Sequence, residues 1–255
     1  MRILIVGATG MVGQSLLREC LLAEDISEVA VLVRSPMNRQ HAKLKQLVAA
    51  DLFTADEVLH AVRDYDACFY CLGVASSGMT EDEYRRITQD LTLATAEQLP
   101  ANNPAMRFIY ISGSGADSSE QGKTMWVWVR GATENVLQRL PFAGVYCFRP
   151  AVVVPKHGVQ SKTASYRWFY RLASPVLPLL QKLPSVITSE QLGQAMLNAA
   201  RFGGDKAVLE AADIKRLRKN EQNQSATYFL VNLAGNEHDT ACPAATSPPR
   251  SCACW

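Results

Sequence analysis

Residues 2–13 read RILIVGATGMVG, an apolar run followed by three glycines that recur every third residue. After its arginine, the run at 2–6 contains only Ile, Leu and Val, which is typical of a strand buried on both faces of a sheet. Apolar residues at helical spacing follow over 11–23. The glycines at 7, 10 and 13 therefore lie between a predicted strand and a predicted helix. A turn of this kind leaves backbone N–H groups open to a phosphate.

Outward from this turn, strand and helix patterns alternate along the first 150 residues. Apolar runs predict further strands at 29–33, 46–49, 67–72, 107–111 and 145–148. Helical composition or spacing is found within 40–47, 58–62, 80–99 and 126–140. Capping boxes at 54–57 and 80–83 are expected to begin the second and third of these helices. This alternation predicts an α/β fold built on a doubly wound parallel sheet.

The rhythm changes after Pro150, where prolines divide the chain into short pieces. We expect an aromatic helix at 165–173, a helix at 189–201 capped by Ser189, and a short strand at 207–209. We interpret 1–217 as a single domain, with its core at 1–150 and a small substrate-side lobe at 151–217. Residues 218–255 show no periodicity and are predicted to be an irregular C-terminal extension.

Composition narrows the class of protein further. The 255 residues carry 26 basic and 24 acidic side chains, a net charge of +2. This balance argues against a dedicated nucleic-acid-binding protein, which usually has a concentrated basic surface. No stretch reaches about 18 consecutive apolar residues, so no membrane span is expected. The apolar run at 3–6 is too short for a signal peptide, and we expect a cytoplasmic protein with reduced thiols. The sequence leaves undecided whether the protein is a monomer or a homodimer.

The glycine turn is the strongest candidate for a ligand site. A dinucleotide pyrophosphate needs a tight turn out of the strand, close backbone approach and the positive end of a helix. The residues that would supply these are Gly7, Thr9, Gly10, Met11, Val12 and Gly13. The alternative is a structural glycine turn without a ligand, but its place between the first strand and helix favours a cofactor.

The end of the second predicted strand bears on which dinucleotide binds. NAD usually requires an acidic residue there for the ribose 2′-hydroxyl. Here the strand at 29–33 ends in Arg34, and Arg39 follows. A guanidinium suits a 2′-phosphate, so we expect NADP rather than NAD. The alternative is that Arg34 is only a solvated residue at a strand end.

The spacing Gly-x-x-Gly-x-x-Gly, with Ala8-Thr9 inside it, resembles the short-chain dehydrogenase/reductase superfamily in its atypical and extended branches. More broadly, the chain resembles atypical short-chain dehydrogenases near the NmrA-like and Tat-interacting-protein-like branch. The motifs that carry this resemblance are 7–13, 70–73, 112–117, 131–135, 148–150 and 191–200. The resemblance covers 1–217 and implies a Rossmann domain that binds NADPH, with an unknown small carbonyl or alcohol as substrate.

The same resemblance implies roles for three residue pairs. Asp51-Leu52 would contact the adenine, Leu72-Gly73 would lie beside the ribose of the cofactor, and Arg149-Pro150 would lie on the substrate side of the nicotinamide. Each pair has an ordinary structural alternative: a loop carboxylate, a turn glycine and a strand terminator, respectively.

Catalysis in that superfamily uses Ser, Tyr and Lys, with Tyr-x-x-x-Lys on one helix face. Ser112 and Ser114 follow the fifth predicted strand and match the serine position. The alignment puts Trp126 at the tyrosine position and Arg130 at the lysine position. Tryptophan cannot exchange a proton in this pH range, although Arg130 could still hold the nicotinamide ribose.

The source of a proton therefore stays open. Tyr110 lies inside a strand, and Tyr84 or Tyr166 would need a fold that the sequence does not show. A shifted acid, a water relay and the absence of chemistry are all compatible with the residues. The two hypotheses are an NADP(H)-dependent oxidoreductase and a catalytically inactive NADP(H)-binding sensor that acts through a protein partner.

The cysteines do not indicate a redox or metal site. Cys68 and Cys71 are three apart on a predicted strand, so their thiols point to opposite faces and are expected in the core. The group His238, Cys242, Cys252 and Cys254 contains one Cys-x-Cys pair, closer than the usual zinc-ligand spacing, so we expect no metal.

Overall fold

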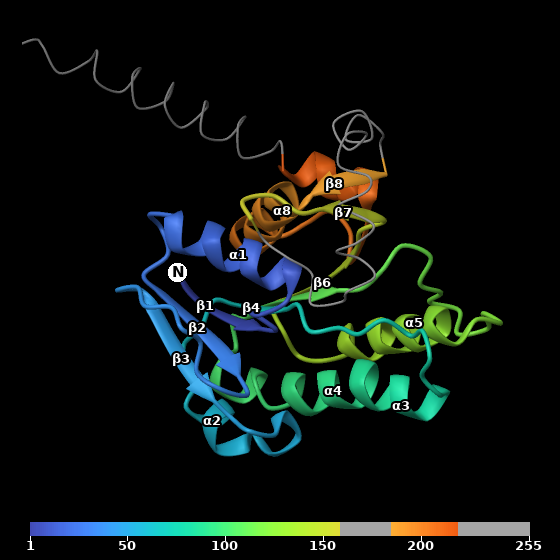
Figure 1. Ribbon diagram of the computed structural model, residues 1–255, viewed down its shortest axis with the longest axis horizontal. Coiled ribbons are helices and arrows are strands. Elements are labelled where there is room, and N and C mark those ends of the chain that lie inside the picture. Colours follow the sequence, from blue (N-terminus) through green and yellow to red (C-terminus); the bar gives the residue numbers. More distant parts are fainter. Residues whose placement is uncertain (159–184, 219–255) are drawn as a thin grey trace, which may run out of the picture. The chain divides into compact units, whose positions relative to one another are not determined.

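The computed structural model describes residues 1–158 and 185–218 (Figure 1). Both described ranges belong to one compact unit. The aromatic helix predicted at 165–173, the cysteine-rich end with His238, and Tyr166 all lie outside the described residues.

Seven of the described strands form one sheet in the order β3-β2-β1-β4-β5-β6-β9. Every pair of neighbours in this sheet is parallel. The strands are β1 (Arg2–Val6), β2 (Glu28–Val33), β3 (Leu44–Val48), β4 (Ala67–Tyr70), β5 (Arg107–Ile111), β6 (Gly144–Arg149) and β9 (Val208–Glu210). The strand order reverses between β1 and β4, which is the topological switch point of a doubly wound sheet. The predicted α/β fold is confirmed.

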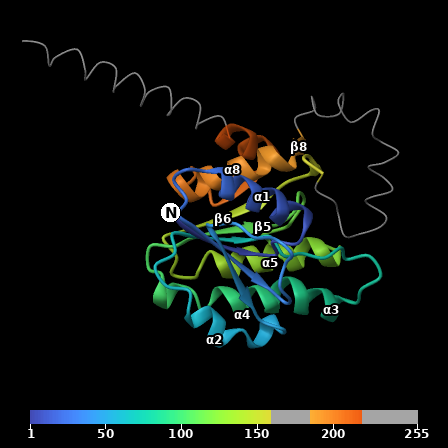
Figure 2. The same cartoon turned by 60° about the vertical axis from the view of Figure 1, so that its left-hand side comes forward.

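Helices cover both faces of the sheet (Figures 1 and 2). One face carries α1 (Met11–Leu22) and α8 (Ser189–Phe202), and the other carries α2 (Asp56–His60), α3 (Glu81–Arg85), α4 (Leu91–Ala96) and α5 (Met125–Leu137). Side chains of β1 alternate between the two hydrophobic clusters: Ile3 and Ile5 pack in one, and Leu4 and Val6 in the other. Burial on both faces explains why the strand reads as a continuous apolar run.

Two local predictions were wrong. The segment 40–47 contains no helix, because β3 already begins at Leu44. Thr54 does not cap α2: it ends a 3-10 turn at Leu52–Thr54, and Ala55 precedes the helix without a side-chain cap. The Asp51 carboxylate accepts a hydrogen bond from Phe53 N at 3.0 Å and caps the start of that turn. Thr54 is therefore part of the turn capped by Asp51 and is not the N-cap of α2.

The other capping signals are largely correct. The predicted box at 80–83 is present, with Glu83 N donating to Thr80 Oγ1 at 3.3 Å and Thr80 N donating to Glu83 Oε2 at 2.9 Å. The long helix that it begins is interrupted by a π turn at Arg86–Asp90 between α3 and α4. Helix α8 is capped one residue earlier than expected, by Thr188, in a box with Gln191.

A second, two-stranded sheet was not predicted. It pairs β7 (Val152–Val154) with β8 (Val186–Thr188) in parallel. Each strand has three residues, too few to show a period of two in the sequence. This sheet continues directly from the end of β6 past Pro150.

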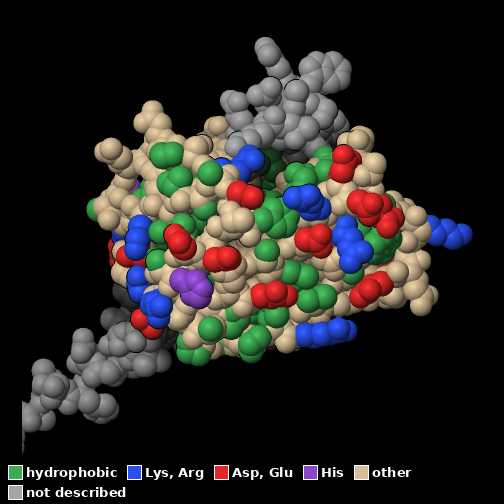
Figure 3. Space-filling view, turned by 90° about the horizontal axis from the view of Figure 1, so that it is seen from below, with side chains coloured by type: hydrophobic (Ala, Val, Ile, Leu, Met, Phe, Trp, Pro, Cys, Tyr) green, Lys and Arg blue, Asp and Glu red, His purple; other side chains and the backbone are tan. Residues whose placement is uncertain are grey.

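The surface below helices α2 to α4 carries acidic and basic side chains interspersed with hydrophobic ones (Figure 3). On this face, acidic and basic side chains are therefore intermixed and do not form separate patches. None of the helices in the described ranges is long and apolar enough to cross a membrane.

Candidate functional site

The parallel register brings the predicted site residues to one edge of the sheet. Gly7 follows β1, Arg34 follows β2, Leu72 lies just beyond β4 and Ser112 follows β5, all at carboxyl ends. The strands on either side of the switch point are joined there, since Cys71 N donates to Val6 O at 2.8 Å. Ligands of open α/β sheets bind at this edge and this crossover.

Two of the three loop glycines, Gly7 and Gly13, are required by close backbone packing. Gly7 has a φ of +86°, and a Cβ atom there would lie 2.6 Å from Leu72 N. A Cβ atom on Gly13 would lie 2.2 Å from Gly7 O, because α1 leaves the loop in direct backbone contact with it. The turn is closed by a hydrogen bond from Gly10 N to Gly7 O at 3.0 Å. These two positions therefore need glycine with or without a ligand.

Gly10 is different, because no described residue requires it to be glycine. Its backbone is extended, with φ −80° and ψ 168°, and the nearest atom to an added Cβ would be Gly7 O at 3.4 Å. It precedes α1, whose first turn has no side-chain cap and no acidic residue. The N–H groups of Met11 and Val12 lack acceptors within the helix. The bare backbone here fits a pyrophosphate that approaches the helix N-terminus.

Thr9 contributes its backbone carbonyl to the packing of this loop. Its carbonyl oxygen accepts a hydrogen bond from Gln14 Nε2 at 2.9 Å. That contact ties the loop to the second turn of α1 and holds it in place before any ligand arrives.

Arg34 stands exposed at the end of β2. Within the described ranges, no hydrogen bond or ion pair engages its guanidinium. The loop that follows Arg34 is held by Gln46 of β3. Gln46 Oε1 accepts a hydrogen bond from Met37 N at 2.6 Å, and Gln46 Nε2 donates to the carbonyl oxygens of Met37 and Arg39 at 3.1 Å each. Sequence reasoning found Arg34 but missed Gln46, whose role depends on the pairing of β2 with β3.

Asp51 and Leu52 lie beyond the end of β3 and have structural tasks there. Asp51 is exposed and caps the 3-10 turn, while Leu52 is buried in a hydrophobic cluster of the core. Neither contact prevents the Asp51 carboxylate from meeting a ligand on its exposed side.

Ser112 and Ser114 differ sharply in their surroundings. Ser112 is 5% exposed, and its Oγ is buried without a hydrogen-bond partner among the described residues. Ser114 is exposed, and its N–H donates to Pro150 O at 3.2 Å. A buried hydroxyl without a partner is costly unless a ligand or water satisfies it. Ser112 is therefore the stronger candidate of the two for contacting a substrate.

Trp126 and Arg130 lie against the glycines that follow β4 and β5. The Trp126 ring is 3.5 Å from the Cβ position of Gly115, and Arg130 Nη2 is 3.7 Å from that of Gly73. Arg130 Nη1 donates to Ile111 O at 3.4 Å, next to Ser112. The guanidinium therefore spans the ends of both strands.

Tyr84 joins this group, which the sequence did not reveal. Its phenolic oxygen accepts a hydrogen bond from Arg130 Nε at 2.9 Å. Burial alone would lower the pKa of Arg130, but the neighbouring phenols of Tyr110 and Tyr84 and the carboxylate of Glu134 raise it above its usual value. Arg130 is therefore a permanent cation. The capping box at 80–83 could have placed Tyr84 on a helix, but not beside Arg130.

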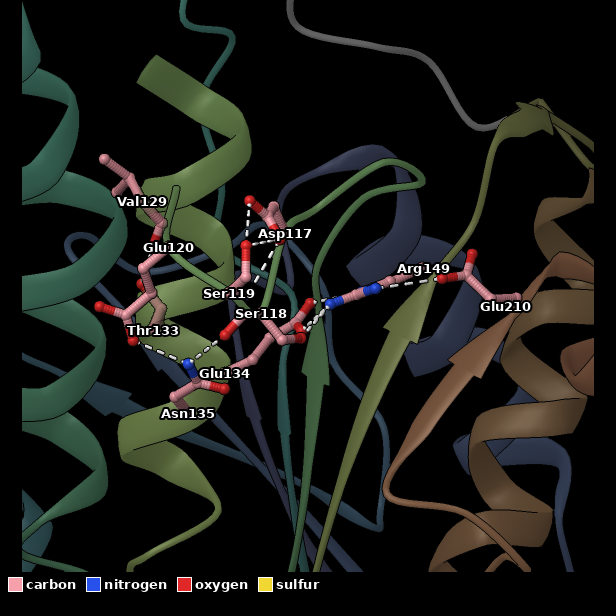
Figure 4. Close-up of polar contacts among 10 residues, drawn as sticks. All are labelled: Asp117, Ser118, Ser119, Glu120, Val129, Thr133, Glu134, Asn135, Arg149 and Glu210. Carbon is pink, nitrogen blue, oxygen red and sulfur yellow. Dashed lines mark hydrogen bonds and ion pairs between the residues drawn. The ribbon is translucent and has the colours of Figure 1, made fainter. Parts of the chain in front are cut away.

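All three nitrogens of the Arg149 guanidinium donate hydrogen bonds to other side chains (Figure 4). Its Nε and Nη2 donate to the two carboxylate oxygens of Glu134 at 3.0 and 2.5 Å. Its Nη1 donates to Glu210 at 3.2 Å, and Nη2 also donates to Ser118 Oγ at 2.8 Å. The hydrogen bond to buried Glu134 is the chief cause that raises the pKa of Arg149. The side chain thus joins α5, β6, β9 and the loop after β5.

That loop is held by further contacts around Arg149. Asn135 Nδ2 donates to Ser118 O at 2.8 Å and to Glu120 Oε1 at 2.7 Å. Gly131 lets the helix approach the loop, because a Cβ atom there would lie 1.7 Å from Asp117 O. Arg149 and Pro150 therefore position the segment that carries Ser112. Sequence reasoning missed Glu134 and Ser118, since no local signal pairs them with an arginine on a distant strand.

The cysteine prediction for β4 and its end is confirmed. Cys68 packs in the cluster on one face of the sheet, and Cys71 packs against the cluster on the other. Burial raises the pKa of the Cys68 thiol well above its usual value, so it is an inert core residue.

Comparison with known proteins agrees with this geometry. A family model described as NAD(P)H-binding matches residues 7–140. Protein HTATIP2 of Rattus norvegicus is 28% identical over 154 residues, which cover 60% of this chain and 62% of that protein, less than two thirds of its length. Protein FMP52, mitochondrial, of Eremothecium gossypii is 26% identical over 236 residues, covering 88% of this chain and 100% of that protein.

Solved structures share the fold. The Bordetella bronchiseptica enzyme WbmF in complex with NAD+ has a TM-score of 0.59 and 17% identity, with 86% of this chain and 77% of that chain covered. An oxidoreductase of the short-chain dehydrogenase/reductase family from Burkholderia thailandensis has a TM-score of 0.60 and 18% identity, with 89% and 97% covered.

Proposed function

The chain belongs to the NAD(P)H-binding family, and on that premise we propose that it is an NADP(H)-dependent oxidoreductase of the atypical short-chain dehydrogenase/reductase branch. The proposed substrate is a small carbonyl compound or the corresponding alcohol. The carboxyl edge of the sheet would bind cofactor and substrate together, with the glycine loop on one side and Ser112 on the other.

One observation carries the cofactor assignment: Gly10 is bare where the protein has room for a side chain. Among the described residues, a Cβ atom there would meet only Gly7 O, at 3.4 Å, whereas Gly7 and Gly13 are fixed by close backbone contacts. The bare position lies at an uncapped helix N-terminus that lacks acidic residues. That combination suits the close approach of a pyrophosphate.

The proposed preference for NADP rests on Arg34. Arg34→Ala is expected to weaken NADPH binding by at least about 10-fold, since a charge-assisted contact to the 2′-phosphate is worth about 1.5–3 kcal/mol. NADH lacks that phosphate, so its affinity should change by less than about twofold. Calorimetric titration of both cofactors measures the difference. Arg139→Ala, which removes an exposed arginine just before β6 at the other edge, is the control. Equal weakening of NADPH and NADH would refute the 2′-phosphate contact.

The residues at the carboxyl edge of the sheet would have separate roles in the reaction. When bound, the reduced nicotinamide supplies a hydride to the carbonyl carbon. Ser112 Oγ, buried and without a partner among the described residues, donates a hydrogen bond to the carbonyl oxygen and orients the substrate. Arg130 reaches toward Gly73, where it would hold the hydroxyls of the nicotinamide ribose. Trp126, in the proposed place of the usual tyrosine, closes this side of the site but cannot transfer a proton.

Ser112→Ala is expected to reduce carbonyl turnover by about 10- to 100-fold while leaving NADPH affinity within about twofold, because the lost contact orients the substrate. Turnover of a panel of aldehydes and ketones is followed by NADPH absorbance. Ser15→Ala is the matched control, since Ser15 Oγ is also buried without a partner in the described ranges but lies within α1. An unchanged rate in Ser112→Ala would remove this serine from the site.

The same panel of aldehydes and ketones distinguishes the oxidoreductase from the second hypothesis, a catalytically inactive NADP(H)-binding sensor. A wild-type protein that binds NADPH but reduces none of the carbonyls would favour the sensor that acts through a protein partner. The buried hydroxyl of Ser112, which no described residue satisfies, favours the enzyme, because a sensor has no need for an oriented donor beside the cofactor.

A further inference from the structure

Three functional groups meet at the end of β5, although they come from three separate parts of the chain. Ser112 supplies a buried hydroxyl, Arg130 of α5 supplies a cation, and Tyr84 of α3 supplies a phenol. Arg130 links them: Nε donates to the Tyr84 oxygen at 2.9 Å, and Nη1 donates to Ile111 O, next to Ser112, at 3.4 Å. In such a set, a phenol can donate a proton to a carbonyl oxygen, a hydroxyl can orient that oxygen, and a cation can stabilise the negative charge that the proton leaves behind.

The phenolic hydrogen of Tyr84 has no acceptor within the described residues. A guanidinium can only donate, so the contact with Arg130 uses the Tyr84 oxygen as acceptor and leaves its O–H unused. Tyr84 is 1% exposed, so bulk water does not routinely satisfy this hydrogen. A buried donor without an acceptor is destabilising and calls for a ligand or a bound water.

Tyr84 is held firmly in this position. The capping box of Thr80 and Glu83 fixes the start of α3, and Tyr84 N donates to Thr80 O at 3.1 Å. On the next residue, Arg85 Nε donates to Gln89 Oε1 at 3.0 Å across the π turn. A donor whose backbone is fixed in this way is preorganised to meet a reacting oxygen.

We infer that Tyr84 is the proton donor to the substrate carbonyl, in place of the tyrosine that the α5 helix lacks. The inference rests on the proposed function. As the carbonyl carbon accepts hydride, a new O–H bond forms between the carbonyl oxygen and the Tyr84 proton, and the Tyr84 O–H bond breaks. The phenolate that remains is stabilised by Arg130. Once the alcohol has left, the phenolate takes up the one proton from solvent that the net reaction consumes, which restores neutral Tyr84.

The test uses 4-dimethylaminocinnamaldehyde, whose absorption band moves to longer wavelength when its carbonyl oxygen accepts a hydrogen bond. With NADP⁺ present, the aldehyde can bind but cannot be reduced, so the shift reports the donor independently of turnover. Wild-type protein is expected to shift the band, and Tyr84→Phe is expected to lose at least about half of the shift. With NADPH, Tyr84→Phe should reduce the aldehyde at least about 100-fold more slowly.

Tyr65→Phe is the matched control. Tyr65 is also buried and hydrogen-bonded through its hydroxyl, to Glu28, but it lies before β4 at the opposite edge of the sheet. This variant should keep both the band shift and the rate. Calorimetry should find that Tyr84→Phe binds NADPH within about threefold of wild type, which shows that the cofactor site is intact.

The outcomes separate failure of the proposed NADP(H)-dependent function from failure of the Tyr84 assignment alone. If wild-type protein binds neither NADPH nor NADH, the proposed function fails. If NADPH binds but Tyr84→Phe matches wild type in shift and rate, only the Tyr84 assignment fails. The assignment also fails if wild type binds NADPH but neither shifts nor reduces the aldehyde, or if Tyr84→Phe weakens NADPH binding by more than about 10-fold.

Discussion

Replacing Glu134 with alanine is expected to lower the free energy of unfolding by about 3–5 kcal/mol, the cost of breaking a buried ion pair by removing one partner. Glu134 is 0% exposed and binds Arg149 through both carboxylate oxygens. Without it, the Arg149 side chain, itself 10% exposed, keeps its charge but loses its buried counterion. Urea denaturation of both proteins measures the difference.

Glu210→Ala is the control for this prediction. Glu210 binds the same guanidinium at 3.2 Å, but its side chain is 49% exposed. Solvent screens such a pair, so the expected loss is below about 1 kcal/mol. Equal losses in Glu134→Ala and Glu210→Ala would show that the Arg149 network does not hold the loop after β5 as described.

Gly13→Ala is expected to destabilise the protein by about 2 kcal/mol or more, because its Cβ would lie 2.2 Å from Gly7 O and force backbone apart. Gly10→Ala should cost about 1 kcal/mol, because alanine is a poorer N-cap residue than glycine, while the contact to Gly7 O at 3.4 Å adds no clash. The same change should weaken NADPH at least about 10-fold by blocking the pyrophosphate. Thermal or urea unfolding and calorimetry measure the two effects separately.

The two glycine variants thus separate a requirement of the fold from a requirement of the ligand. If Gly10→Ala bound NADPH as well as wild type did, the bare position would have no relation to a cofactor. If Gly13→Ala were as stable as wild type, the direct contact between the loop and α1 would not be needed.

The sequence predicted those parts of the fold that depend on local signals or on burial of a whole strand. The apolar run at 2–6 and the glycines behind it define β1, the turn and α1 without tertiary information. The box at 80–83 succeeded because nothing nearby competes with it. The box at Thr54 failed because Asp51 caps a turn first. The three-residue strands β7 and β8 were missed because they carry no measurable period.

The candidate site was predictable only as far as the topology of the sheet determines it. Arg34 and Ser112 follow parallel strands, so the doubly wound order alone sends them to the same edge. Tyr84 and Glu134 act through contacts with arginines far away in the chain, and no spacing rule encodes such pairs. For Arg149, only the structure reveals that its donors are taken by the protein itself.

Calorimetric titration of the wild-type protein with NADPH and with NADH tests the central claim most directly. We expect NADPH to bind with a Kd below about 100 μM, which corresponds to about −5.5 kcal/mol, and more tightly than NADH. A wild-type protein that binds neither cofactor below that concentration would contradict the assignment of the glycine loop, and with it both the enzyme and the sensor.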